Sequence, residues 1–96
     1  MKKTAQVKSK KRRVSFSLDA PHAQQVSLVG DFNAWDPKKH PMKKSADGLW
    51  EKTVILGPGS YEYKFMQDDR WMLDPGNDQQ CLNRFGTRNN VIVVSS

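Results

Sequence analysis

The ionisable side chains of this sequence offer few arrangements that could catalyse a reaction. Its two histidines, His22 and His40, each lie beside a proline in a polar segment, without a serine, cysteine or acid in a nucleophile context. We therefore expect both to be solvated loop histidines. Closely spaced carboxylates include Asp68 with Asp69 and Asp74 with Asp78. Such pairs can serve glycoside hydrolysis, but adjacent acids in turns usually serve turn geometry and solvation, so no catalytic, metal or phosphate site is predicted.

Flat aromatic and amide side chains stand out instead, because they occupy loops and outward strand positions. Trp35 follows the end of a predicted strand, Trp71 follows a polar turn, and Phe85 opens the segment before the last strand. A pyranose ring has an apolar face and a rim of hydroxyls, so a sugar site combines flat aromatics with a few fixed donors and acceptors. Lys64, on the polar face of a strand, and Asn89, in a loop, could both reach hydroxyls. The pattern favours a sugar-binding surface.

Each of these residues also has a purely structural interpretation. Trp35 and Trp71 could be half-buried packing residues, although their placement in a loop and at a strand edge frees a ring face and favours stacking. On pattern alone, Lys64 could equally be an exposed strand charge. Thr87 could simply favour a strand, and Asn89 could bond only the turn backbone.

The strand that must position the first tryptophan lies in the stretch 26–37, around which the rest of the chain is arranged. Its apolar residues alternate with Ser27 as far as Gly30, where the strand is predicted to end. The turn-forming residues that follow are Asp31, Asn33, Asp36 and Pro37. A loop held by its own polar residues can hold Trp35 outward.

The remaining segments are short and have a period of two, with a turn signal after each. Asp47-Gly48 is a strong hairpin signal, and Gly57-Pro58-Gly59 turns the chain again. The predicted strands are 14–19, 26–29, 42–45, 49–56, 61–66, 71–73 and 90–95. Residues 74–83 are expected to form a loop, and no helical period is present. The sequence therefore predicts an all-β fold, an antiparallel β-sandwich.

The inward-facing residues of these strands predict the hydrophobic core, since alternation directs one apolar face of each strand toward the other sheet. Trp50, beside the hairpin turn, is expected to pack on the sandwich or to cover an edge. The predicted core consists of Val14, Phe16, Leu18, Val26, Leu28, Val54, Leu56, Tyr61, Tyr63, Phe65, Val91 and Val93. The two tyrosines need partners for their hydroxyls.

The positive charge of the chain is concentrated at its amino terminus. The net charge is +6, and seven of the 16 lysines and arginines lie in residues 1–13, which contain no acid. We predict that residues 1–13 form a disordered basic tail and that residues 14–96 form the β-sandwich. A solubilising leader is favoured over a hook for nucleic acid or an acidic partner, because no second basic patch supports the hook.

Length and composition exclude several classes of protein. A chain of 96 residues forms one domain and falls far short of the roughly 250 residues of a (β/α)8 barrel enzyme. Its single cysteine, Cys81, cannot close an internal disulfide or make a zinc cage. No apolar run approaches the roughly 18 residues of a membrane span, and no apolar h-region follows the amino-terminal charges, so no signal peptide is expected. We expect a cytoplasmic protein with no cofactor and no membrane contact. Since the chain begins at Met1 and ends soon after the last strand, no attached catalytic domain is expected.

Four separated motifs give the sequence a resemblance to a known family. They are 28–35 (LVGDFNAW), 59–65 (GSYEYKF), Arg70-Trp71 with Asp74-Pro75, and 86–91 (GTRNNV). In this order, over about residues 14–94, the chain resembles the family 48 carbohydrate-binding modules. These include the glycogen-binding domain of the AMP-activated protein kinase β subunit and the amino-terminal modules of isoamylase-type and branching enzymes. The resemblance implies an immunoglobulin-like, early-set β-sandwich whose ligand is an α-1,4-glucan such as glycogen, starch or maltooligosaccharide.

The resemblance also implies a set of site residues. The implied carbohydrate-binding residues are Trp35, Lys64, Trp71, Phe85, Thr87 and Asn89. The tryptophans match the family's stacking residues, and the lysine matches its hydroxyl-binding lysine. The threonine and asparagine match further sugar contacts. Phe85 stands where the kinase modules carry a leucine that reaches into the glucan turn, so it could stack instead of insert.

Two functions are expected from these observations. The first is non-catalytic binding of α-1,4-glucan, by the chain alone or as a subunit that carries a partner to polysaccharide. The alternative is a regulatory module that holds a kinase or an amylolytic enzyme, with the tail binding an acidic partner or nucleic acid. Although the family's modules are attached to family 13 glycoside hydrolases, the short chain and the missing acid pair predict no hydrolase activity here.

Overall fold

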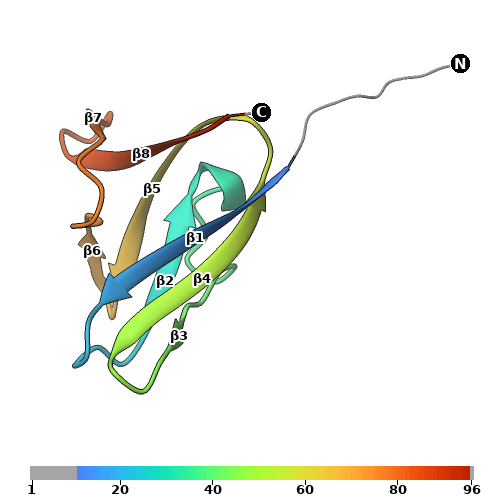
Figure 1. The fold of residues 1–96 in the computed structure, drawn as a ribbon. Coiled ribbons are helices and arrows are strands. Elements are labelled where there is room, and N and C mark those ends of the chain that lie inside the picture. The colour runs from blue at the N-terminus through green and yellow to red at the C-terminus, as the bar shows by residue number, and fades with distance from the viewer. Residues whose placement is uncertain (1–10, 96) are drawn as a thin grey trace, which may run out of the picture.

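The computed structural model describes residues 11–95, which form two antiparallel sheets packed face to face (Figure 1). The first sheet has the order β1-β4-β3 and contains β1 (Arg12–Asp19), β4 (Leu49–Leu56) and β3 (Lys43–Lys44). The second sheet has the order β2-β5-β8-β7, and β6 also pairs with β5. Its strands are β2 (Val26–Gly30), β5 (Gly59–Gln67), β6 (Arg70–Met72), β7 (Gln80–Leu82) and β8 (Arg88–Val94). The predicted all-β sandwich is confirmed.

The strand β5 organises the second sheet because it forms pairs along both of its edges. Along one edge it pairs with β2, and Gly30 lies opposite Tyr63. The other edge is shared end to end, since β8 pairs with the first half of β5 and β6 pairs with the last three residues. Asn90 of β8 also lies opposite Tyr63. The end of β2 and the beginning of β8 therefore flank the same point of β5.

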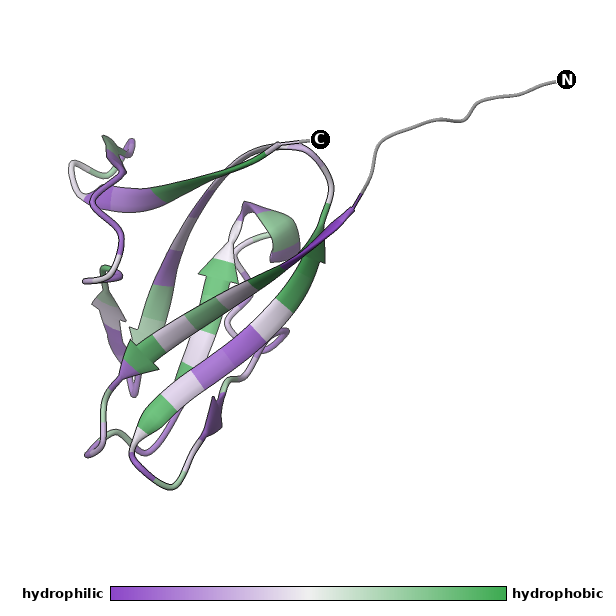
Figure 2. Ribbon diagram, in the orientation of Figure 1, coloured by the Kyte–Doolittle hydropathy of each residue, from purple (hydrophilic) through white to green (hydrophobic). Residues whose placement is uncertain are grey.

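The core lies between the two sheets. Tyr63 and Phe65 are 2% and 0% exposed, and the rings of Phe16 and Tyr63 meet edge to face at 4.9 Å. Trp50 is buried, as expected, and its indole N–H donates to the carbonyl of Ala20 at 2.8 Å. Figure 2 shows polar positions interrupting the hydrophobic ones along β1 and β2, which is the pattern of strands with one buried face.

The strand β8 directs its side chains differently from the prediction. Val93 is predicted to face the core, but it is 73% exposed, and Val91 is only partly buried. Val94, at 7% exposure, and Ile92 pack against the core instead. The prediction is wrong by one residue, which in a strand moves every side chain to the opposite face.

The cause of this error is Asn90, a polar residue at the first inward position of β8. Its side chain is 0% exposed. Its Oδ1 accepts the amide N–H of Asp74 at 2.7 Å, and its Nδ2 donates to the carbonyl of Asn77 at 3.1 Å. Because these bonds satisfy the side-chain amide of Asn90, it can be buried. The inward apolar residues of β8 begin only at Ile92, so the sequence pattern does not show which face is inward.

The boundary between the tail and the sandwich also differs from the prediction. Arg12 and Arg13 are predicted to belong to the tail, but they pair with β4 as the first residues of β1. Backbone pairing needs no apolar side chain, so alternation marks only the buried part of the strand. The predicted disorder of residues 1–10 falls outside the described residues.

The strand β7 lies in the segment 74–83, which is predicted to be a loop. It has three residues and pairs with β8 from Gln80 opposite Asn90 to Leu82 opposite Arg88. So short an edge strand carries no periodic signal. A one-turn 3-10 helix, Asp31–Asn33, follows β2. Within residues 11–95, no helix has the length and apolar character needed to cross a membrane.

Candidate functional site

A cleft lies on the outer face of the second sheet, away from the core. Tyr63 and Phe65 face the core, so the alternate residues Glu62 and Lys64 of β5 face outward. The cleft has a volume of about 830 Å³. All six residues predicted from the sequence line it, namely Trp35, Lys64, Trp71, Phe85, Thr87 and Asn89. Its lining is completed by Ala34, Glu62, Leu82, Asn83 and Arg84.

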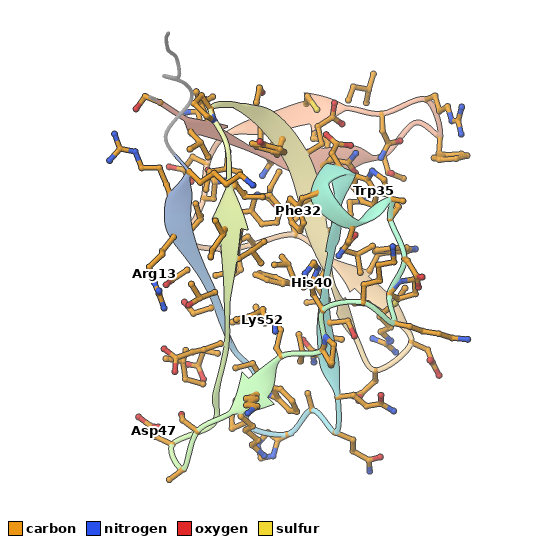
Figure 3. All side chains as sticks on the ribbon, turned by 90° about the vertical axis from the view of Figure 1, so that its right-hand side faces the viewer. Arg13, Phe32, Trp35, His40, Asp47 and Lys52 are labelled. Carbon is orange, nitrogen blue, oxygen red and sulfur yellow. The ribbon has the colours of Figure 1, made fainter. Side chains whose placement is uncertain are left out.

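Trp35 is held on one side of the cleft by the tight turn that follows β2 (Figure 3). Its amide N–H donates to the carbonyl of Gly30 at 3.0 Å, so the chain turns back at the end of the strand. Asp31 binds through both carboxylate oxygens. Oδ1 accepts the indole N–H of Trp35 at 2.9 Å, and Oδ2 accepts the amide N–H of Glu62 at 2.7 Å. Asp31 therefore ties the indole to β5, which fixes the orientation of the ring.

The Trp35 turn contains two consecutive residues with left-handed backbone conformation. The φ angles of Ala34 and Trp35 are 57° and 59°. This conformation costs a residue with a Cβ roughly 1–2 kcal/mol, because the Cβ approaches the following carbonyl oxygen. The turn is therefore strained at the position where it presents the indole.

We expect Ala34→Gly to raise the free energy of unfolding by roughly 0.5–1 kcal/mol, because glycine adopts a positive φ without this clash. The alanine side chain is exposed, so little packing is lost. Urea denaturation of the variant and the wild type measures the change. Ala46→Gly is the matched control: Ala46 is exposed and has no positive φ, so glycine there should lower the free energy of unfolding. A loss of stability in both variants would contradict the conclusion that the backbone at Ala34 is strained.

Trp71 reaches the same part of the cleft from β6 and is 49% exposed. The turn before it is anchored by Asp68, whose Oδ1 accepts the amide N–H groups of Gln24 and Gln25 at 2.9 and 3.0 Å. The ring centroids of Trp35 and Trp71 are 6.2 Å apart, and the ring planes meet at 65°. The two indoles therefore form an edge-to-face pair that presents two planes at an angle.

The floor of the cleft carries polar groups from β5 and β8. Lys64 is only 9% exposed, which contradicts its interpretation as an exposed strand charge, and its ammonium lies 3.4 Å from the hydroxyl oxygen of Thr87. Asn89 is 6% exposed, and its Nδ2 donates to Oε1 of Glu62 at 2.9 Å. An ammonium has three donors, so Lys64 keeps hydrogen-bonding capacity for a ligand in the cleft.

The end of β7 and the loop between β7 and β8 form the opposite wall. Leu82 and Phe85 are 67% and 76% exposed, and the guanidinium of Arg84 lies 5.2 Å from the centroid of the Phe85 ring. The carbonyl of Asn83 accepts the amide N–H of Gly86 at 3.1 Å, which closes a four-residue turn. This wall is thus apolar at its rim and carries one cation.

Several lining residues are not predicted from the sequence. Asn83 does carry a signal, because asparagine and glycine at the first and fourth positions are typical of a type I turn, and Gly86 has this spacing. Glu62 carries none, since an acid that alternates with apolar residues on a strand is ordinarily solvated. Leu82 and Arg84 enter the cleft only because β7 pairs with β8.

Comparison with known proteins shows the family of this chain. The sequence matches the family described as carbohydrate-binding module 48 (isoamylase N-terminal domain) over residues 4–80, well over half of the chain. The chain belongs to this family. The resemblance predicted from the four motifs is therefore confirmed. Trp35, Lys64 and Trp71 lie within the matched residues, whereas Phe85, Thr87 and Asn89 lie beyond them.

This family 48 module is also similar to 1,4-alpha-glucan branching enzymes. It is 44% identical over 52 residues to GlgB 2 of Xanthomonas campestris pv. campestris (strain 8004), which covers 54% of the chain and 7% of that enzyme. With GlgB of Prochlorococcus marinus (strain NATL1A) it shares 54% identity over 60 residues, or 59% and 8% of the two chains. With GlgB of Novosphingobium aromaticivorans it shares 43% over 74 residues, or 74% and 10%. The module thus spans a tenth or less of these relatives.

Behind the Trp35 turn, His40 differs from the prediction. Asn33 bonds the backbone at both ends of its amide, accepting from the Gly30 N–H at 3.0 Å and donating to the Leu28 carbonyl at 2.9 Å. Its second N–H donates to Nδ1 of His40 at 2.7 Å, which requires a neutral imidazole. Figure 3 shows His40 between Phe32 and Lys52. The predicted solvated loop histidine is therefore wrong for His40.

We expect acidification to destabilise the module through His40. Burial, followed by the charges of Lys52 and Lys39, lowers the pKa of His40 from its ordinary 6.5. The unfolded chain then takes up a proton before the folded one. The stabilising contribution of neutral His40 to the free energy of unfolding is complete above pH 6.5. It is lost as the pH falls from 6.5 toward the lowered pKa of His40 in the folded protein.

Urea denaturation at about pH 7.5 and about pH 5.5 measures this effect. His40→Gln should lose less stability between the two conditions than the wild type does. His22→Gln is the matched control, because His22 is exposed. If His40→Gln and the wild type lost equal stability on acidification, the explanation through His40 would be wrong.

Two of the four carboxylates considered for catalysis, Asp74 and Asp68, make structural bonds. Oδ2 of Asp74 accepts the Tyr63 hydroxyl at 2.7 Å, and Oδ1 accepts the amide N–H of Gly76 at 2.9 Å. Burial raises the pKa of Tyr63, so its hydroxyl remains a neutral donor to this carboxylate. Asp68 similarly joins its turn to the β1–β2 loop. These are the turn roles predicted for Asp74 and Asp68.

Proposed function

We propose that this family 48 module binds α-1,4-glucans such as glycogen, starch and maltooligosaccharides, by stacking sugar rings on Trp35 and Trp71. The observation that carries the proposal is the pair of indoles, which share one cleft at a centroid distance of 6.2 Å and an interplanar angle of 65°. Successive rings of an α-1,4-glucan turn relative to one another, whereas those of a β-1,4-glucan form a flat ribbon. Two angled ring planes suit the turning chain.

The polar floor complements this stacking surface. A glucosyl ring placed on an indole directs its hydroxyl rim sideways, and the ammonium of Lys64 and the hydroxyl of Thr87 lie in the same cleft. Lys64 is held at 9% exposure, so a hydroxyl that binds it meets a donor that is already largely desolvated. Phe85, at 76% exposure on the far wall, offers a third ring to a longer chain.

The proposed module is non-catalytic. Glycoside hydrolysis ordinarily needs two carboxylates on either side of the scissile bond. Among the described residues that line the cleft, Glu62 is the single carboxylate, and it is bonded to Asn89. The branching enzymes carry the similar segment as 7–10% of their length. This small share is consistent with a binding role for the segment.

Affinity electrophoresis in native gels that contain glycogen tests the proposal. A shallow stacking site binds weakly and gains from engaging several sugar units together, so a polysaccharide gel detects it well. We expect retardation in glycogen, no retardation in a gel without polysaccharide, and little in soluble cellulose derivatives. Maltoheptaose should compete better than maltose. Wild-type protein that migrates equally in all gels would remove the proposal.

A further inference from the structure

Asn83 uses all of its side-chain hydrogen-bonding capacity inside the wall of the cleft. Its Oδ1 accepts the amide N–H groups of Phe85 at 2.9 Å and Thr87 at 3.2 Å. Its Nδ2 donates to Oγ1 of Thr87 at 2.7 Å and to Oδ1 of Asn89 at 2.9 Å. Two donors and two acceptors are all that an amide side chain possesses, so Asn83 has none left for a ligand.

These bonds determine whether the Thr87 hydroxyl donates or accepts a hydrogen bond in the cleft. A hydroxyl has one donor and two acceptor positions. Oγ1 of Thr87 receives a hydrogen bond from Asn83 at 2.7 Å and faces the Lys64 ammonium at 3.4 Å, so both acceptor positions are occupied. The hydroxyl proton of Thr87 is then directed elsewhere, and Thr87 is exposed and lines the cleft.

We infer that Asn83 is a positioning residue that fixes the Thr87 hydroxyl as a hydrogen-bond donor toward the glucan. The inference rests on the proposed function, since it assigns a direction to one contact of that site. Together with the Lys64 ammonium, Thr87 then presents donors on this side of the cleft, and a sugar oxygen bound there must accept. Asn83 itself does not touch the ligand.

The two halves of the Asn83 amide can be separated by mutation. Asn83→Asp keeps oxygen acceptors for the amide N–H groups of Phe85 and Thr87, so the turn retains its backbone bonds. It removes both Nδ2 donors. The Thr87 hydroxyl must then turn its proton toward the new carboxylate, and it no longer donates to the sugar. Thr87→Val removes the same hydroxyl directly.

A double-mutant cycle on the complete chain tests the inference, with maltoheptaose binding measured by titration calorimetry. We expect Asn83→Asp and Thr87→Val each to weaken binding roughly three- to tenfold, the range for one lost hydrogen bond. The double variant should be no weaker than the weaker single variant, because both changes remove one contact. Gln79→Glu, an exposed amide-to-carboxylate change outside the cleft lining, is the control for net charge and should bind like the wild type.

Each other outcome overturns the inference. Fold-losses that multiply in the double variant would show that Asn83 acts independently of the hydroxyl, and wild-type affinity in Asn83→Asp would show that it has no such role. If the wild-type protein does not bind maltoheptaose, the proposed function itself is wrong. The cycle therefore separates a failure of the proposed function from a failure of the role inferred for Asn83. Thermal melting confirms folding. If Asn83→Asp does not fold, Asn83→Ser replaces it, because its hydroxyl oxygen can accept a turn amide but is too short to reach both Thr87 and Asn89.

Discussion

A variant with alanine at both Trp35 and Trp71 is expected to bind maltoheptaose at least a hundredfold more weakly than the wild type while remaining folded. Removing one large aromatic from the centre of a binding site costs roughly 1.5–3 kcal/mol, which corresponds to about ten- to a hundredfold in affinity. Trp71 is 49% exposed and lies outside the core cluster, so the sandwich is expected to fold without its ring. Because the two rings form an edge-to-face pair with centroids 6.2 Å apart, the effects of the single variants are not expected to add.

Titration calorimetry and glycogen affinity gels measure this loss. Trp71→Phe is the matched variant, because it keeps a flat apolar face of smaller area and should bind between the wild type and Trp71→Ala. Circular dichroism establishes that each variant is folded. A folded double variant that is retarded in glycogen like the wild type would show that the indoles are not the binding surface.

Gly30→Ala is expected to lower the free energy of unfolding by about 3 kcal/mol or more, the range of severe overpacking in a closed site. The backbone of Gly30 is extended, so the reason is space and not φ. A Cβ on Gly30 would lie 2.5 Å from the carbonyl oxygen of Glu62 and 2.8 Å from the Cβ of Tyr63. Neither atom can yield without moving β5, which carries the core on one face and the cleft on the other.

The matched control for this variant is Gly57→Ala. No atom lies within 4 Å of a Cβ built there, and its φ is not positive. Alanine at this position should therefore be neutral or slightly stabilising, since it restricts the unfolded chain. Urea denaturation of both variants measures the difference. Equal stabilities for Gly30→Ala and Gly57→Ala would mean that the close approach of β2 to β5 does not limit residue 30.

Local signals predict much of this fold. The strand β4 has the predicted bounds, Leu49–Leu56, because Asp47-Gly48 specifies the turn before it and Gly57 follows it. Prediction from local sequence fails where a polar residue is buried because hydrogen bonds to other parts of the chain satisfy its side chain. Asn90 begins the predicted strand 90–95 as a polar residue outside the predicted core, yet it is 0% exposed in the structure, so the inward face of β8 is misassigned. His40 is similar, because the hydrogen bond from Asn33, seven residues earlier in the chain, holds its ring partly buried.

The candidate site is predictable to the extent that its residues belong to motifs. Trp35, Lys64 and Trp71 stand in recognisable segments, and the structure places all three in one cleft. The roles of the residues that orient them cannot be predicted in this way, since Asp31 lies in the first motif but is predicted only to form a turn. The function of Asp31 depends on Glu62, 31 positions away in the chain, whose amide N–H it accepts while it holds the indole. Pairing between strands creates that contact, and a linear pattern cannot show it.

The alternation of β5 has a practical consequence for engineering. Tyr63 and Phe65 maintain the interior, whereas Glu62 and Lys64 face the cleft. Randomising only the cleft-facing positions, together with the exposed residues Phe85 and Arg84, would vary the recognition surface without touching the core between the sheets. The scaffold is therefore suited to libraries selected for other oligosaccharides, in which loss of folding and change of ligand can be scored separately.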